Sequence, residues 1–164
     1  MPTIRSATLT HEGGLRFSTV TGSGRAIVWG EDAELGELSP VETLTAAIAA
    51  CSAMDVISIA RKKRQGIDAY RIHVRAEQRD EAPKVLTTVD VVHEVFGPRV
   101  DEAAIRRAIE LSADRYCPVS AMISAGATEV HHRYVVHNTG PTPFEAEGEV
   151  MVTGPYRRPD VVGG

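Results

Sequence analysis

This 164-residue chain has two cysteines, Cys51 and Cys117, and they are its strongest candidates for reactive residues. Cys51 lies within a run rich in alanine, serine and threonine, and Cys117 directly precedes Pro118. A thiolate is a nucleophile and a metal ligand, and two thiols that meet in a fold can form a disulfide. The residues alone leave two interpretations open, a redox pair or two packed core thiols.

The surroundings of the two cysteines differ. If Pro118 begins a short helix, Cys117 lies at its N-cap, where free backbone amides stabilise a thiolate. Cys51 would need a cation or a hydrogen-bond donor from elsewhere in the fold. Asp55 follows Cys51 by one helical turn, and a carboxylate so close raises a thiol pKa rather than lowering it. Because buried acids are normally paired, we expect Asp55 to bind a buried arginine or a backbone donor across the dimer.

A long helix is predicted from Ser39 to Arg64, with Cys51 near its middle. Ser39 and Glu42 have the spacing of a capping box, and Pro40 suits the first helical position. The small residues that fill this stretch allow close approach by neighbouring backbone. We therefore expect a buried central helix. Alanine, serine and threonine make it too weakly hydrophobic for a membrane span of roughly 20 predominantly apolar residues, so no span is predicted.

Composition narrows the classes of partner and cofactor. A net charge of −4 and a pI near 5.9 give no reason to expect nucleic acid. The N-terminus has no apolar signal region, so a cytoplasmic protein is expected. Among the six histidines, His131, His132 and His137 are the densest group, but adjacent strand residues point to opposite faces. The sequence therefore predicts no metal site, and no nucleotide-binding motif or other cofactor signal is found.

The order of the remaining elements predicts an α+β fold, because strands and helices come in segregated runs. We expect a single domain over residues 1–139 and an extended or partly disordered extension over 140–164. A central helix this apolar needs cover on several sides, which predicts a homodimer. Strands are expected at 3–10, 14–20, 25–29, 69–77, 85–96 and 128–137, and further helices at 101–113 and 118–125.

The segments around both cysteines resemble the OsmC/Ohr family, the osmotically inducible protein C and organic hydroperoxide resistance group. In that family a proline lies eleven residues before the first cysteine, as Pro40 does before Cys51. A second cysteine followed by Pro-Val comes much later, as in the YCPVS of residues 116–120. The resemblance covers residues 1–139 in element order. It implies an OsmC-like fold, with antiparallel sheets wrapped around a long central helix in an intertwined homodimer.

The resemblance also implies a chemistry: thiol-dependent reduction of organic hydroperoxides in oxidative stress defence. Carried over, Cys51 would be the peroxidatic thiolate and would become a sulfenic acid. Cys117 would resolve that acid into a disulfide, which an external dithiol would reopen. No metal, flavin or haem is implied. The catalytic glutamate of the family is represented here by Glu42.

Two features depart from the family pattern. The family places its glutamate directly after the proline, where this chain has Val41, and one helical position is a rotation of about 100°. The family also uses an N-terminal arginine, for which Arg25 and then Arg16 are candidates. Two other functions therefore stay open. One is a non-enzymatic dimer that binds a small apolar ligand or partner, and the other is a thiol- or sulfur-transfer enzyme with one reactive cysteine.

Overall fold

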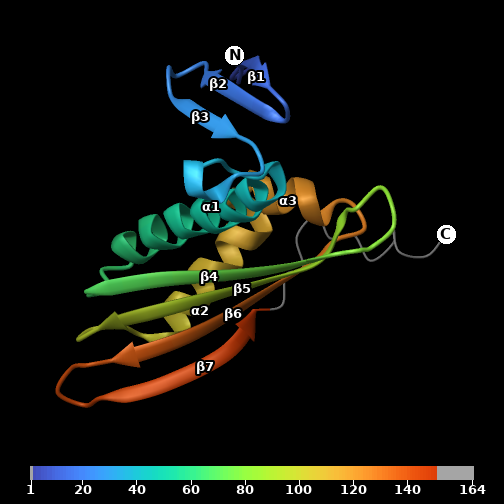
Figure 1. Cartoon of the computed structure of the whole chain (residues 1–164). Coiled ribbons are helices and arrows are strands. Elements are labelled where there is room, and N and C mark those ends of the chain that lie inside the picture. Colours follow the sequence, from blue (N-terminus) through green and yellow to red (C-terminus); the bar gives the residue numbers. More distant parts are fainter. Residues whose placement is uncertain (1, 151–164) are drawn as a thin grey trace. The chain divides into compact units, whose positions relative to one another are not determined.

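The chain divides into two compact units, residues 1–44 and residues 45–164, and each has its own sheet. The computed structural model describes residues 2–150 (Figure 1). The single domain expected over residues 1–139 stays a prediction. The α+β class is confirmed, because both units combine strands with helical segments.

The N-terminal unit is a three-stranded antiparallel sheet in the order β1-β2-β3. The strands are β1 (Ala7–Gly13), β2 (Arg16–Thr21) and β3 (Ala26–Trp29), and a short 3-10 turn, η1 (Ala33–Leu35), follows. The predicted hairpin is confirmed. Its turn passes through Gly14 at φ 54°, a left-handed conformation that glycine adopts without a Cβ penalty.

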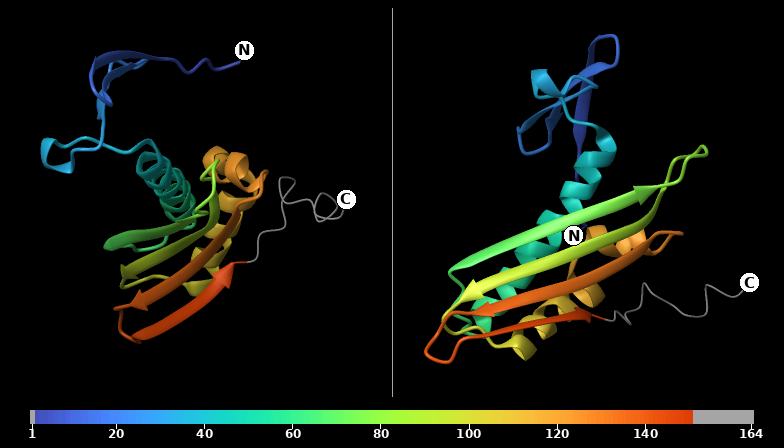
Figure 2. Two further views of the ribbon diagram at one scale, coloured as in Figure 1. Left: turned by 45° about the vertical axis from the view of Figure 1, so that its right-hand side comes forward. Right: turned by 60° about the horizontal axis from the view of Figure 1, so that its bottom comes forward.

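The C-terminal unit places α1, α2 and α3 on the same face of a four-stranded sheet (Figure 2). The first turn of α1 belongs to the N-terminal unit and the rest of the helix to the C-terminal unit. The elements are α1 (Pro40–Lys62), β4 (Ala69–Gln78), β5 (Leu86–Gly97), α2 (Glu102–Leu111), a π-helical turn η2 (Ser112–Tyr116), α3 (Pro118–Ser124), β6 (Glu129–Asn138) and β7 (Phe144–Val150).

The four-stranded sheet has the order β4-β5-β6-β7 and contains one parallel pair. The predicted antiparallel ribbon of β4 and β5 is confirmed, and β6 and β7 are also antiparallel. The expectation of wholly antiparallel sheets is wrong at β5 and β6, which run parallel. The physical reason is the crossover of α2, η2 and α3 between them, because parallel strands need a long connection across one face of the sheet.

The last strand, β7, lies in the segment that the sequence placed outside the domain. Residues 144–150 pair with β6 from His132 to Asn138, so the sheet extends past the expected boundary at residue 139. Three glutamates alternate with uncharged residues along this strand, but alanine and glycine at positions 146 and 148 give its less exposed face little hydrophobic signal. The remainder of the expected extension, residues 151–164, lies outside the described residues.

The core of the C-terminal unit lies between the helices and the sheet. In α1 every fourth residue from Ile48 to Ala60 is fully buried, and in α2 the predicted stripe of Ile105 and Ile109 is buried as well. In β4 the side chains of Tyr70, Ile72, Val74 and Ala76 alternate with exposed ones, as predicted. The principal core cluster is Val56, Ala60, Val95, Val100, Ile105, Ala108, Ile109, Tyr134, Val136 and Val150.

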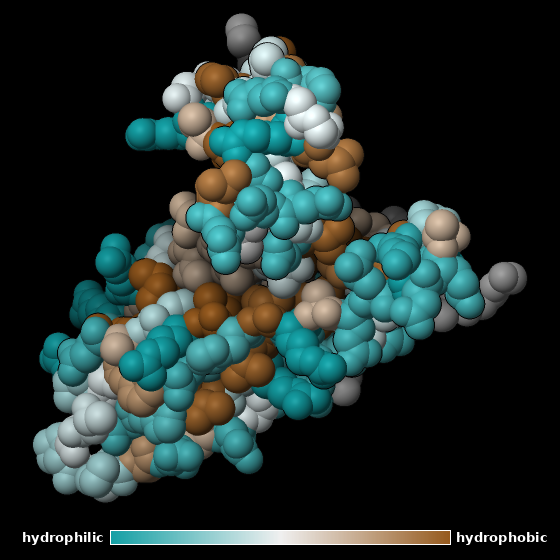
Figure 3. Space-filling view, viewed as in Figure 1, coloured by the Kyte–Doolittle hydropathy of each residue, from teal (hydrophilic) through white to brown (hydrophobic). Residues whose placement is uncertain are grey.

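The other side of α1 is only partly covered in a single chain. Met54 is 74% exposed, and Ala50 and Ser58, one turn before and after it, are also exposed. Hydrophobic side chains are visible at the surface of the C-terminal unit (Figure 3). By length and composition α1 could cross a membrane, although the core helix of a soluble protein passes the same test. Uncovered apolar helix surface is what the homodimer prediction requires.

Truncation of a core side chain should cost stability in proportion to the cavity it leaves. Ile109→Ala removes a fully buried side chain that contacts α1 and the sheet through the core cluster. We expect a loss of about 2–5 kcal/mol in the free energy of unfolding. Urea titration at a fixed protein concentration measures it, with Val85→Ala, at a 43% exposed site, as the control. A loss no larger than that of the control would contradict this core assignment.

The homodimer prediction is tested by the mass of the protein in solution. Light scattering should give twice the 17.7 kDa of one chain. Met54→Glu should shift the mass toward that of one chain, because a carboxylate would be buried against apolar surface without a partner. The control is Val85→Glu in the loop before β5, which should leave the mass unchanged. A wild-type protein that is monomeric at all concentrations would refute the dimer.

Candidate functional site

Two helices of the C-terminal unit bring the cysteines together. Cys51 lies in α1 directly before the fully buried Ser52, which leaves the Cys51 side chain partly exposed. Cys117 lies at the start of α3 and is 2% exposed. The two Sγ atoms and a carboxylate oxygen of Asp55 all lie within 4.8 Å of one another. Both cysteines are unoxidised, and the two are close enough for direct contact between their thiols.

The position of Cys117 follows from a break between two helices. The π-helical turn η2 ends at Tyr116, and the backbone amide of Cys117 donates to the carbonyl of Ser112 at 2.8 Å. Pro118 then begins α3, and Cys117 is its N-cap residue, as the sequence predicted. The Ser120 amide donates to Cys117 Sγ at 3.4 Å. The sulfur thereby accepts one of the amides that a helix start leaves without an intrahelical partner.

The Cys51 thiol is held in its protonated form. Burial raises its pKa to about 11, with a further contribution from its hydrogen bond with Cys117. The backbone amide of Val119 bonds to the sulfur and acts in the opposite direction, while the nearby Cys117 and the Asp55 charge raise the pKa further. The effect of Asp55 has the sign expected from the sequence. Among the described residues, no positively charged side chain contributes to these main influences on the pKa of Cys51.

Asp55 takes part in a small buried hydrogen-bond network. Ser112 Oγ donates to Asp55 Oδ2 at 3.1 Å, and Ser52 Oγ lies 3.4 Å from Ser112 Oγ. Burial raises the pKa of Asp55, and the bond from Ser112 opposes that shift. Within the chain a serine hydroxyl provides the bond to Asp55. The expected buried arginine or backbone donor across the dimer stays a prediction, because it concerns a second chain. Ser112 carried no sequence signal, since a serine at a helix end ordinarily faces solvent or caps the backbone.

Glu42, the third predicted catalytic residue, forms a capping hydrogen bond at the start of α1. Its Oε2 accepts the backbone amide of Ser39 at 3.3 Å, which is the glutamate half of the predicted capping box. Glu42 belongs to the N-terminal unit, whereas both cysteines belong to the C-terminal unit. Its catalytic role stays a prediction.

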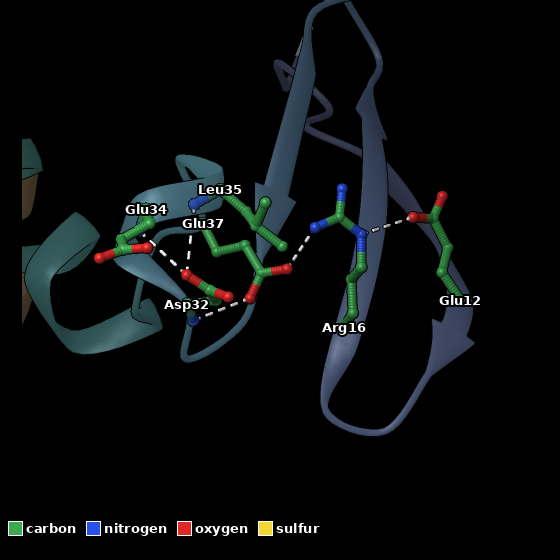
Figure 4. A network of polar contacts seen from close by, with 6 residues as sticks. All are labelled: Glu12, Arg16, Asp32, Glu34, Leu35 and Glu37. Atoms are coloured by element: carbon green, nitrogen blue, oxygen red, sulfur yellow. Dashed lines mark hydrogen bonds and ion pairs between the residues drawn. The ribbon is translucent and has the colours of Figure 1, made fainter.

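The two candidate arginines also belong to the N-terminal unit. Arg16 is bound by Glu37 and by Glu12, and the Glu37 carboxylate also accepts the amide of Asp32 at 2.9 Å (Figure 4). These two carboxylates raise the pKa of Arg16 and offset its charge locally. Arg25 is exposed at the start of β3. Support of Cys51 by either arginine stays a prediction.

The histidines of β5 and β6 form a buried chain that the sequence did not predict. Tyr70 Oη lies 2.6 Å from His93 Nδ1, and His93 Nε2 lies 3.2 Å from His132 Nδ1. Burial lowers the pKa of His93 to about 3, so both of its ring nitrogens serve in a neutral network. His131 points to the other face and contacts Glu129, which confirms the predicted opposition of His131 and His132. One feature of the sequence could have predicted this chain: His93 and His132 each occupy a buried position in a strand with alternating burial.

The fold and the site together define a two-thiol α+β protein, with helices on one face of a mixed sheet and two cysteines between α1 and α3. The model of the OsmC-like protein family matches residues 30–133, and the chain belongs to this family. It is 35% identical over 123 residues to protein YhfA of Escherichia coli K12, covering 75% of this chain and 91% of that protein.

Solved structures agree with this family assignment. A hypothetical protein from Aquifex aeolicus has a TM-score of 0.73 and 28% identity, covering 82% of this chain and 97% of that one. An organic hydroperoxide resistance protein from Legionella pneumophila has a TM-score of 0.59 and 16% identity, covering 82% and 96%. At that identity the Legionella structure shows the shared fold alone.

The protonated state of Cys51 predicts how fast it reacts with an alkylating reagent. Because the thiolate is the reactive form and the pKa is about 11, alkylation should accelerate about tenfold per pH unit between roughly pH 7 and pH 10. Asp55→Asn should increase the rate near pH 8, because it removes a nearby negative charge. Mass spectrometry of the peptide containing Cys51 measures the alkylation rate at each pH. A rate that is already constant below pH 8 would contradict the raised pKa.

Proposed function

We propose that the protein reduces organic hydroperoxides, with Cys51 as the nucleophile and Cys117 as the resolving thiol. The observation that carries this proposal is the approach of the two sulfurs within 4.8 Å of each other from separate helices. Two thiols this close need side-chain rotation, rather than a new fold, to approach the S–S length of about 2.05 Å. We expect an organic hydroperoxide to be preferred over hydrogen peroxide, because α1 is rich in apolar residues.

The reaction balances with the two thiols and one external dithiol. The Cys51 thiolate attacks one peroxide oxygen, the O–O bond breaks, and the alcohol leaves after protonation while Cys51 becomes a sulfenic acid. The Cys117 thiol then attacks that sulfur and releases water, which forms the disulfide. A dithiol reductant reopens the disulfide by exchange and is itself oxidised. The net reaction converts a hydroperoxide and a dithiol into an alcohol, water and a disulfide.

The difference in access supports the proposed roles of the two cysteines. Cys51 is partly exposed and can meet a substrate, whereas Cys117 is 2% exposed and can meet only a group that is already in the site. The Val119 amide bonds to the Cys51 sulfur and would stabilise the thiolate there. Cys117, held by the Ser120 amide, is positioned behind it as the second thiol.

The reaction also needs a proton acceptor for Cys51. With a pKa of about 11, the thiol is protonated at neutral pH, so the rate of the first step should rise with pH. Glu42 and an arginine from the N-terminal unit are the candidates that the family resemblance offers. The Legionella relative named an organic hydroperoxide resistance protein supports the chemistry only through its shared fold. We place the protein as a homodimer in the cytoplasm, where a dithiol reductant keeps its thiols reduced.

The test is turnover of cumene hydroperoxide with a dithiol reductant, with hydrogen peroxide in parallel. Wild-type protein should prefer the organic peroxide, and activity should increase with pH. Cys51→Ser should abolish turnover. Cys117→Ser should permit a single oxidation of Cys51 but lose at least about tenfold in steady turnover with the dithiol, because no internal disulfide forms.

Mass spectrometry after limited peroxide provides the matching chemical readout. Rapid loss of two hydrogens per chain, located at Cys51 and Cys117, is expected. Full turnover by Cys51→Ser would refute the mechanism. Turnover that is intact in Cys117→Ser but absent in Cys51→Ser would instead indicate the single-cysteine thiol- or sulfur-transfer function.

A second candidate is a non-enzymatic protein that binds a small apolar ligand or partner. Two observations favour it, the raised pKa of Cys51 and the presence of Val41 where the family has its glutamate. This function predicts no turnover of any hydroperoxide and a Cys51 that stays unreactive toward a thiol probe in the folded protein.

A further inference from the structure

Three side chains of different chemistry converge where α1 meets the start of α3. Cys51 and Asp55 are four residues apart in α1 and therefore share a face of the helix. Cys117 reaches the same point from the N-cap of α3, and the three ligating atoms lie within 4.8 Å of one another. We propose that the reduced protein binds a thiophilic divalent cation, Zn²⁺ in particular, through Cys51, Asp55 and Cys117.

The donor set is one that zinc uses. Thiolate sulfur binds Zn²⁺ at about 2.3 Å and carboxylate oxygen at about 2.0–2.2 Å, in a tetrahedral arrangement. Donor atoms around such an ion lie roughly 3.5 Å apart, so the present separations, all within 4.8 Å, need to contract by about 1 Å at most. Side-chain rotation can supply that change. Three protein ligands leave a fourth position for water or another small donor.

The surrounding hydrogen bonds already orient these donors. Ser112, which is fully buried, donates to Asp55 Oδ2 at 3.1 Å and leaves the other carboxylate oxygen available. The amides of Val119 and Ser120 bond to the sulfurs of Cys51 and Cys117 respectively. Outer hydrogen bonds of this kind fix ligand orientation in metal sites, and amide donors stabilise thiolate ligands.

The charges also favour a cation at this point. Two thiols and a carboxylate are gathered in a partly buried space, and no cation is among the dominant electrostatic effects on Cys51 from the described residues. A divalent ion would replace both thiol protons and offset the charge of Asp55. The negative charge that opposes a bare Cys51 thiolate would then help to hold the ion. This assignment revises the expectation of no metal, which considered histidines and regular spacing motifs but not a site built from two helices.

Metal binding at this site is independent of peroxide turnover, but it uses the same two sulfurs. Diamide would oxidise both thiolates to a disulfide by accepting two electrons from the sulfurs and two protons from solvent, and two of the three ligands would be lost. The bound ion should then be released. Zinc occupancy and the disulfide are therefore mutually exclusive states of one site.

The experiment uses the full chain, reduced and freed of metal under anaerobic conditions, with Co²⁺ as the spectroscopic probe. We expect one Co²⁺ per chain, with a thiolate-to-cobalt charge-transfer band and the visible bands of tetrahedral coordination. Zn²⁺ should displace the Co²⁺, and diamide should release the Zn²⁺ to a chromophoric chelator. Cys51→Ser and Cys117→Ser should each weaken or remove the charge-transfer band.

Asp55→Asn separates this site from a simple pair of thiols. It should weaken Zn²⁺ binding by at least about tenfold, while Asp80→Asn, the same change at an exposed site in the loop between β4 and β5, should not. Circular dichroism checks that both variants fold. No charge-transfer band in the wild-type protein, or equal Zn²⁺ affinity for Asp55→Asn and wild type, would overturn the proposal.

The outcomes keep the two proposals distinct. If peroxide oxidises Cys51 and Cys117 to a disulfide but Zn²⁺ does not bind, the metal site is refuted and the peroxidase is supported. If Zn²⁺ binds through all three residues but hydroperoxides are not turned over, the metal site is supported and the peroxidase is refuted.

Discussion

Every fourth residue of α1 between Ile48 and Ala60 is fully buried, and this stripe sets the rotation of the helix within the C-terminal unit. Cys51 immediately precedes one stripe residue, Ser52, and Asp55 immediately precedes the next, Val56. Both side chains are therefore turned to the edge of the buried face, where they are partly covered and still reachable. A shift of the stripe by one residue would bury these groups fully or expose them, so the packing of α1 determines the character of the site.

The second half of the site depends on the crossover between the parallel strands β5 and β6. The chain must pass across one face of the sheet, and it does so through α2, the π-helical turn η2 and α3. A π-helical turn changes the direction in which side chains project, and such turns are frequent at functional sites. Here η2 begins at Ser112, which donates to Asp55, and ends at Tyr116, directly before the N-cap residue of α3, Cys117.

The two thiols lie close together, but the raised pKa of Cys51 makes it a weak nucleophile at neutral pH. Burial, a neighbouring thiol and a carboxylate all stabilise the protonated form of Cys51, and the Val119 amide opposes them only in part. No cation is among the main influences on Cys51 from the described residues, and a positive charge beside the sulfur would favour nucleophilic chemistry at neutral pH. A protein arginine that activates the thiol, or a metal ion that replaces its proton, would supply this charge in different ways. These alternatives connect the hydroperoxide and zinc proposals to a single physical requirement.

The sequence by itself determined the central helix with its capping box, the β4 and β5 ribbon, the N-cap position of Cys117 and the family. Capping, alternation and helix breaks depend on neighbours in the chain, so these features can be predicted from local pattern. Only the tertiary structure decided the parallel pairing of β6, the addition of β7, the serine partner of Asp55 and the convergence of three donors near Cys51. Each of these depends on contacts between segments far apart in the sequence, which hydrophobic period and turn chemistry do not encode. The pKa of Cys51 belongs to the same group, because burial and the approach of Cys117 exist only once α1 and α3 have packed.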